Sequence, residues 1–206
     1  MMSMREARQD DLSDKFIALT FDDGPHASNT SYLLDIAKEK AVRLTFFVIG
    51  QRVERNWKLV QRQASEGHEV GNHSWSHRDL TKLDDSSSHA EIQKTEDIII
   101  QYTGVRPHLF RPPYGQITGP QQEWLSRDLG YKTIFWTIDS LDWQVRDAEA
   151  IARQVLGRVR PGSIVLFHDI HRRSVEAMPV IFEWLLSVGY KLVTVTDLLR
   201  RTIASG

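Results

Sequence analysis

The sequence contains no cysteine, and this absence restricts its chemistry. It excludes disulfide bonds, thiolate metal ligands and a cysteine nucleophile, so any bound metal must use oxygen and imidazole ligands. An excess of charge of one sign is also missing, because 26 Lys and Arg residues face 27 Asp and Glu residues and the net charge is −1. The chain therefore lacks the basic surface typical of nucleic-acid-binding proteins. A neutral or weakly charged substrate fits it better.

Long apolar runs are absent as well. No segment approaches the length of a membrane span, and residues 1–15 are polar and lack the apolar core of a secretory signal. We therefore expect a protein that binds neither membranes nor nucleic acid. We also expect it to be a monomer. The sequence as given predicts a cytoplasmic protein, or an exported domain if a leader has been removed.

Short β-rich segments alternate with longer amphipathic segments, after a polar N-terminal arm at residues 1–14. Strands are predicted at 16–21, 44–49, 68–71, 109–111, 133–138, 163–167 and 191–195. Helices are predicted at 29–40, 54–66, 86–103, 119–129, 147–159 and 174–188. This alternation predicts an α/β fold with a parallel sheet in one domain over residues 15–206. Either a closed barrel or an open doubly wound sheet is consistent with the pattern.

Polar clusters follow most of the predicted strands. Asp22 and Asp23 follow the first strand, and His73 and His77 follow the third. Further clusters lie at 111–114, 139–143 and 168–169. Because functional groups gather at the carboxyl ends of parallel strands, we expect all five clusters to meet on one rim of the sheet.

Asp22 and Asp23 are adjacent carboxylates in a DDGP sequence, which is also typical of a simple turn. In the functional interpretation, one carboxylate binds a metal while its neighbour accepts a proton from water as a general base. His73 and His77 lie four residues apart, and on a helical turn their side chains would be about 5–6 Å apart on one face. Together with Asp23 they form a two-histidine, one-carboxylate set that leaves coordination positions open.

Two of the three remaining clusters allow two interpretations each. Arg111 precedes a stiff RPPYG turn, which is either a salt-bridged loop or a device in which the arginine orients a carboxylate such as Asp22. In the second case the backbone N–H of Tyr114 can donate to a developing oxyanion. Trp143 either anchors an acidic turn at 139–143 or stacks on a sugar ring. His168, beside a carboxylate that keeps it protonated, suits a general acid.

Five segments carry a resemblance to a known family: TFDDG, HSWSH, RPPYG, DSLDW and LFHD, at 20–24, 73–77, 111–115, 139–143 and 166–169. In order and spacing they resemble the motifs of the polysaccharide deacetylases of carbohydrate esterase family four, the NodB-homology domain. The resemblance spans residues 15 to about 201, and five ordered motifs are far more specific than HxxxH alone. It implies a distorted (β/α) barrel with about seven parallel strands.

The resemblance also implies roles for individual residues. Asp23, His73 and His77 match the metal ligands, with zinc as the expected ion and cobalt, nickel or manganese as alternatives. Asp22 matches the catalytic base, and His168 the catalytic acid.

The other matched residues support these groups. Asp142 matches the carboxylate partner of the acid, and Arg111 the residue that positions the base. Tyr114 matches the residue whose backbone N–H contributes to the oxyanion hole. Trp143 and Leu166 match residues that line the pocket for the acetyl methyl group.

The activity that the resemblance implies is metal-dependent removal of N-acetyl groups from N-acetylglucosamine in chitin-like oligosaccharides or peptidoglycan. An O-acetyl esterase acting on xylan, or an amidase acting on small rings, would use the same groups. A catalytically inactive sugar-binding module is a further alternative, because a fold does not determine function.

Overall fold

A computed structural model of the protein describes residues 15–145 and 147–204. The polar arm predicted at 1–14 lies outside the described residues. The strands are β1 (Phe16–Asp22), β2 (Thr45–Val48), β3 (Glu69–Asn72), β4 (Leu109–Phe110), β5 (Lys132–Thr133), β6 (Ile138–Asp139), β7 (Ile164–His168) and β8 (Lys191–Leu192). The α-helices are α1 (Asn29–Glu39), α2 (Gly50–Arg55), α3 (Trp57–Ser65), α4 (Asp85–Thr103), α5 (Gly119–Arg127), α6 (Ala148–Leu156), α7 (Arg172–Ser187) and α8 (Val195–Ala204).

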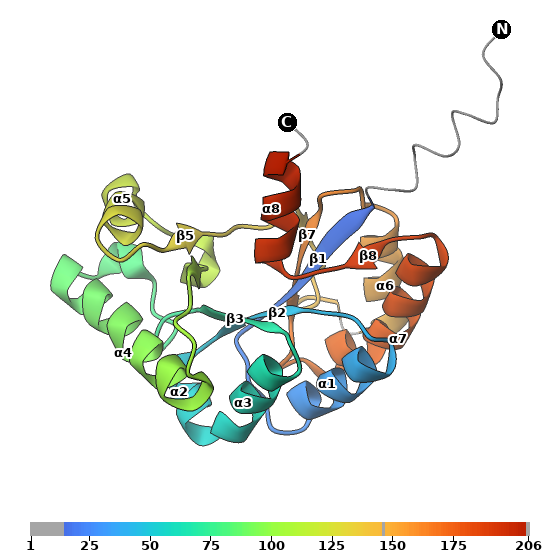
Figure 1. Ribbon diagram of the computed structural model, residues 1–206, viewed down its shortest axis with the longest axis horizontal. Helices are drawn as coiled ribbons and strands as arrows, with labels where there is room; N and C mark the ends of the chain where they lie inside the picture. Colours follow the sequence, from blue (N-terminus) through green and yellow to red (C-terminus); the bar gives the residue numbers. More distant parts are fainter. Residues whose placement is uncertain (1–14, 146, 205–206) are drawn as a thin grey trace, which may run out of the picture.

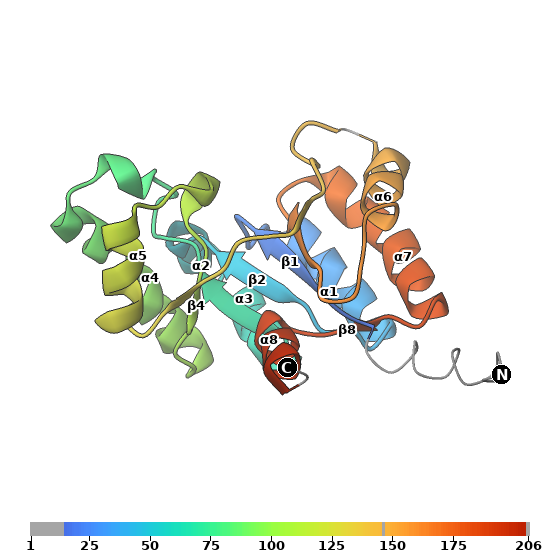
Figure 2. The ribbon, with the colours of Figure 1, turned by 90° about the horizontal axis from the view of Figure 1, so that it is seen from above.

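Seven parallel strands form a curled sheet in the order β5-β4-β3-β2-β1-β7-β6, and β8 pairs with the first residues of β1. The end strands β5 and β6 do not pair with each other among the described residues, so the barrel is open on that side. Helices α6, α7, α1, α3 and α4 pack against one another in succession along the outside of the curl (Figures 1 and 2). The expected distorted barrel of about seven strands is thereby confirmed.

Side chains of β1 alternate between two environments, as the pleat of a strand requires. Leu19 and Phe21 face the helix layer, where Phe21 stacks on Phe46 and Phe167 of the neighbouring strands at centroid distances of 5.6 and 5.5 Å. Ala18 faces the other side and packs in a smaller cluster with Val195 and other residues of α8. Figure 1 shows α8 across β1 from α1. The central strand is therefore covered on both faces, which leaves its carboxyl end for the polar groups.

Three predicted elements differ from the structure. The strand predicted at 133–138 is two short strands, β5 and β6, because the backbone between them leaves the sheet and its carbonyl groups at Ile134 and Phe135 accept hydrogen bonds from Arg111. The helix predicted at 54–66 is divided at Asn56, which has φ −131°. The strand predicted to reach residue 195 ends at Leu192, and α8 follows it. No described helix has both the length and the apolar character needed to cross a membrane.

Candidate active site

Five of the sequence clusters meet at the carboxyl ends of β1, β3, β4, β6 and β7, as expected for a parallel sheet. They surround a pocket of about 460 Å³. Its lining consists of Asp22, Asp23, His73, His77, Pro112, Tyr114, Gly115, Trp136, Asp139, Trp143, Leu166 and His168. Of the predicted site residues, Arg111 and Asp142 do not line the pocket but contact residues that do.

Asp23, His73 and His77 form one compact group whose candidate ligand atoms all lie within 4.8 Å of one another. Asp23 Oδ1 is 3.2 Å from His77 Nε2 and 3.5 Å from His73 Nε2. This oxygen is buried and has no hydrogen-bond partner, which is costly unless a cation completes its environment. The donor set contains only oxygen and imidazole nitrogen, as a zinc or similar divalent site requires. The residues therefore fit the metal that the sequence motifs imply.

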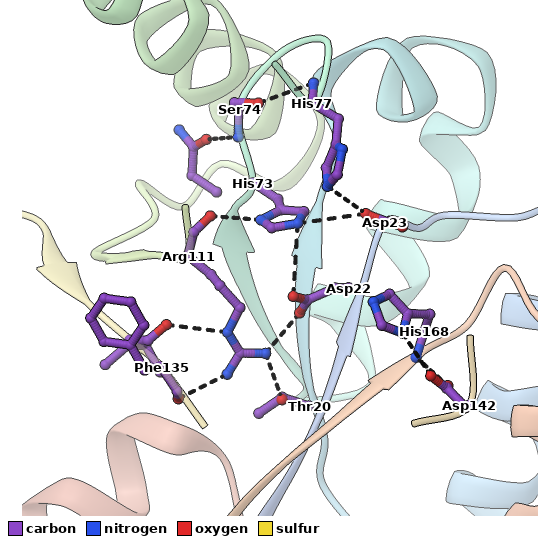
Figure 3. A network of polar contacts seen from close by, with 12 residues as sticks. Thr20, Asp22, Asp23, His73, Ser74, His77, Arg111, Phe135, Asp142 and His168 are labelled. Carbon is purple, nitrogen blue, oxygen red and sulfur yellow. Dashed lines mark hydrogen bonds and ion pairs between the residues drawn. The ribbon is translucent and has the colours of Figure 1, made fainter. Parts of the chain in front are cut away.

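Backbone conformation separates the two adjacent carboxylates. Asp23 has φ +71°, which is unfavourable for a residue with a side chain. Its carboxylate lies beside the two histidines, whereas that of Asp22 lies beside Arg111 (Figure 3). Burial alone would raise the pKa of Asp23, but the neighbouring imidazoles bring that pKa below its ordinary value and keep the group ionised.

The hydrogen bond made by His73 determines which of its nitrogens can bind a cation. Its Nδ1 lies 2.6 Å from the backbone carbonyl oxygen of Arg111, which can only accept a hydrogen bond. Nδ1 therefore carries a proton, and Nε2, which faces the Asp23 carboxylate, is the nitrogen that can bind a cation once its own proton has left. Burial, followed by the charge of His73, lowers the pKa of His77 and favours the neutral form that a ligand needs.

The segment from His73 to His77 is an irregular loop, so the expected helical turn is wrong. Ser74 and His77 both have positive φ, +64° and +60°, and these angles bring the two rings to a centroid distance of 4.9 Å. Asn72 accepts a hydrogen bond from the backbone N–H of Ser74, and the Ser74 hydroxyl accepts one from the N–H of His77 (Figure 3). The four-residue spacing identified the right pair of histidines, but the helical geometry on which that prediction depended is absent.

Glu91, on α4, fixes the middle of this loop and was not identified from the sequence. One of its carboxylate oxygens accepts a hydrogen bond from the Ser76 backbone N–H at 2.8 Å, and the other accepts one from the Ser76 hydroxyl at 2.6 Å. A glutamate on an amphipathic helix resembles an ordinary surface residue in the sequence. Only the packing of α4 beside the loop reveals its function of holding the chain between the two histidines.

We expect Glu91→Ala to lower the affinity for a divalent metal by about 10- to 100-fold, the usual cost of losing a group that orients metal ligands. The loss of two hydrogen bonds frees the loop and misplaces His77. Metal affinity can be measured by competition with a chromogenic chelator. Asp97→Ala, which removes an exposed carboxylate on the same helix, is the control. Equal affinities in the two variants would contradict this function of Glu91.

Arg111 is fully buried and makes a charged contact with the predicted base. Its Nη1 donates to Asp22 Oδ1 at 2.7 Å and to the Thr20 hydroxyl at the same distance (Figure 3). Its Nε and Nη2 donate to the carbonyl groups of Ile134 and Phe135 at 3.2 Å. The ion pair between Arg111 and Asp22 is consistent with both interpretations left open by the sequence, the salt-bridged loop and the arginine that orients a carboxylate.

His168 lies on the opposite side of Asp22 and Asp23 from the two other histidines (Figure 3). Its Nδ1 is 2.7 Å from Asp142 Oδ1, and its backbone N–H donates to Asp142 Oδ2. Ser174 donates a third hydrogen bond to this carboxylate. Burial opposes protonation, but the hydrogen bond and charge of Asp142 outweigh it and raise the pKa of His168 to about 9. His168 is therefore a protonated acid at neutral pH.

Apart from Asp139, the rest of the pocket wall is aromatic or apolar. Tyr114 has φ +58° and its ring meets that of His77 edge-on at 4.6 Å. Trp143 is 52% exposed, as a surface on which a sugar can stack must be, whereas Leu166 is buried. Trp136, which the sequence left ambiguous, also lines the pocket. No pattern distinguished it from a core residue of a strand, because the departure of this segment from the sheet is not visible in the sequence.

Comparison with known proteins adds independent findings. Residues 9–134 match the family model described as polysaccharide deacetylase. The chain is 39% identical over 94% of its length to the peptidoglycan-N-acetylglucosamine deacetylase PgdA of Listeria monocytogenes. It is 39% identical over 96% of its length to the peptidoglycan-N-acetylmuramic acid deacetylase PdaC of Bacillus subtilis. It spans 41% and 42% of the lengths of these two relatives.

Solved structures agree with the sequence relatives. The structure of B. subtilis PdaC superposes with a TM-score of 0.89 at 39% identity, and the match covers 94% of each chain. The Xyl-CE4 domain of a multidomain xylanase from the hindgut metagenome of Trinervitermes trinervoides gives a TM-score of 0.84 at 34% identity, with 92% of each chain covered.

Proposed function

The chain belongs to the polysaccharide deacetylase family, and from this premise we propose that it is a metal-dependent hydrolase that removes N-acetyl groups from N-acetylglucosamine in peptidoglycan or chitin-like oligosaccharides. The observation that carries the proposal is the pocket itself. A metal-binding group, a carboxylate base and a protonated histidine acid face one cavity. The names of PgdA and PdaC favour a peptidoglycan substrate.

We assign the metal site to Asp23, His73 and His77, with zinc as the ion that best fits this donor set. When bound there, a divalent ion supplies Lewis-acid polarisation of the acetamide carbonyl and makes water more acidic. Asp22, held in place by Arg111, accepts the proton of the attacking water. The Tyr114 backbone N–H donates a hydrogen bond to the oxyanion that forms at the carbonyl oxygen.

His168 completes the reaction by protonating the leaving group. Its Nδ1 is hydrogen-bonded to Asp142, so its Nε2–H is the proton available to the sugar nitrogen. The C–N bond of the acetamide breaks, acetate retains the oxygen from water, and the sugar leaves as a free amine. Without this proton the amine would be a poor leaving group. Trp143 and Leu166 hold the substrate by contacts with the sugar and the acetyl methyl group.

A second activity uses the same groups. The Xyl-CE4 domain is part of a xylanase, and an O-acetyl ester presents the same carbonyl to the base and the oxyanion donors. An alkoxide leaves more readily than an amine anion, so an ester depends less on His168. An inactive sugar-binding module is disfavoured because the base, the acid and the three ligand candidates are all present.

The test is to incubate the protein with peptidoglycan fragments, N-acetylglucosamine oligomers and acetylated xylan, with and without a chelator, and to follow acetyl loss by mass spectrometry. Each acetyl group that is replaced by hydrogen lowers the substrate mass by about 42 Da; we expect this loss from the N-acetylated substrates without chelator, and no loss when the chelator is present. Acetyl loss from xylan alone would establish the esterase. Binding without any chelator-sensitive turnover would establish the inactive module.

We expect the pH dependence of kcat/KM to lose activity at alkaline pH as His168 deprotonates, with a midpoint near its pKa of about 9. Asp142→Asn removes the charge that raises this pKa, so the alkaline limb should move to lower pH, towards the ordinary value for histidine. Ser174→Ala is the control, because it removes one hydrogen bond to Asp142 and keeps the charge. A limb at the same pH in Asp142→Asn and the unmodified protein would contradict the assignment of the acid.

A further inference from the structure

A second hollow of about 490 Å³ lies beside the active-site pocket. The two share a wall, because His77 and Tyr114 line both. The other lining residues are Arg78, Asp79, Lys82 and Leu83, and none of these four lines the active-site pocket. The hollow is therefore within reach of a sugar unit next to one whose acetyl group lies beside His77.

Arg78 brings an uncompensated positive charge to the hollow. It follows His77 directly, so its Cα is one peptide unit, about 3.8 Å, from that of the candidate ligand. Its side chain is exposed, and within the described part of the chain it takes part in no ion pair. A guanidinium with five donors and no carboxylate partner is well suited to bind a carboxylate of the substrate.

The other charges of the hollow neutralise each other. Lys82 Nζ is 3.1 Å from Asp79 Oδ2, and the other oxygen of Asp79 accepts hydrogen bonds from the Thr81 backbone N–H and hydroxyl. Both carboxylate oxygens of Asp79 are thereby occupied, one by Lys82 and the other by the short 3-10 helix at Leu80–Lys82 that Asp79 caps. The guanidinium of Arg78 is therefore the charge in the hollow that these pairs leave unbalanced.

We propose that this hollow is a subsite for a carboxylate carried by the sugar unit next to the one that is deacetylated. The inference rests on the proposed function and specifies its substrate class. Alternate sugars of peptidoglycan carry a lactyl ether, which ends in a carboxylate or continues into a peptide with further carboxylates, whereas chitin carries none. Arg78 then makes the protein select the anionic polymer, and it does so through binding and not through the chemical step.

Four tetrasaccharides separate the sources of the carboxylate: N-acetylglucosamine tetramer, the peptidoglycan repeat with free lactyl groups, the same repeat with lactyl methylamides, and the repeat with stem peptides. The measurement is the ratio of kcat/KM between the free lactyl and methylamide forms at low ionic strength. We expect Arg78→Gln to lower this ratio about five- to tenfold, mainly through KM, as expected for loss of one charged hydrogen-bonded pair. The effect should shrink with added salt.

Arg158→Gln is the matched control, because it makes the same charge change at an exposed arginine between α6 and β7, on the opposite rim from the site. A ratio that changes equally in both variants, or in neither, overturns the subsite for lactyl groups. If Arg78→Gln instead lowers kcat/KM only for the peptide-bearing substrate, the bound carboxylate belongs to the stem peptide. That result supports the same subsite, occupied by a carboxylate farther from the sugar ring.

Dissociation constants keep this test separate from the proposed function. They are measured for the same four ligands in His168→Ala protein, which retains the hollow. If no substrate is deacetylated by the unmodified protein, the proposed function fails, while tighter binding of the lactyl than of the methylamide form, lost with Arg78→Gln, still supports the subsite. Equal binding of the two forms, without an Arg78-dependent gain in binding of the stem-peptide form, overturns it whatever the turnover.

Discussion

Replacement of His168 by alanine is expected to lower kcat for N-acetylated substrates by about 10²- to 10⁴-fold, the usual contribution of a general acid. The amine cannot leave without a proton, and the structure supplies that proton from one imidazole held by Asp142. Metal affinity should remain nearly unchanged, because His168 is not among the three residues whose ligand atoms converge. Single-turnover kinetics together with metal titration measure both quantities.

Ester substrates provide an internal control for this variant. An O-acetyl or p-nitrophenyl ester has a leaving group that needs little protonation, so its hydrolysis should fall much less than that of the amide. His171→Ala is the matched histidine variant, since its ring stands beside that of His168 at a centroid distance of 5.7 Å. Unchanged amide turnover in His168→Ala, or an equal loss in His171→Ala, would show that the proton comes from another group.

Replacement of Asp23 by alanine is expected to remove the metal and to lower turnover on the order of 10³-fold or more, as for other groups on which a whole catalytic unit depends. Asp23 Oδ1 is the atom that lies closest to both histidines, and it is the only anionic ligand in the group. Two neutral imidazoles alone bind a divalent ion weakly. Elemental analysis of the purified variant measures the loss directly.

Folding must be preserved for this result to be informative. Removing the Asp23 carboxylate breaks no hydrogen bond of its Oδ1, and alanine keeps the same positive φ, so the thermal unfolding temperature without metal should change little. Asp79→Ala, outside the pocket, serves as the carboxylate control for metal content. Stoichiometric metal in Asp23→Ala would refute the ligand set.

The sequence was most informative where residue type and order carry the chemistry. Asp22, Asp23, His73, His77 and His168 were all placed on one rim from motifs and strand ends alone, and the structure brings them to one pocket. Their roles in the reaction stay predictions until the variants are measured.

Sequence reasoning failed where distant contacts decide the local structure. The segment at 133–138 has the β-branched and aromatic composition of one strand, but Arg111 draws two of its carbonyl groups away from the sheet. The loop that carries the histidines depends on positive φ angles held by Asn72 and Glu91, which come from a strand and from α4. Neither dependence leaves a periodic pattern, since Glu91 lies 15 residues from the Ser76 that it holds and Arg111 lies 23 and 24 residues from the two carbonyl groups that it binds.

Because of the position of Arg111, effects of its replacement on catalysis and on folding are difficult to separate. The same guanidinium that orients the base ties β4 to β1 and to the irregular backbone after β5, beside the open edge of the barrel. A change there leaves a buried carboxylate unpaired, at a cost of about 3–5 kcal/mol. Libraries that aim to alter the reactivity of the base should therefore keep this arginine constant, because inactive members would include unfolded ones and the screen could not tell the two apart.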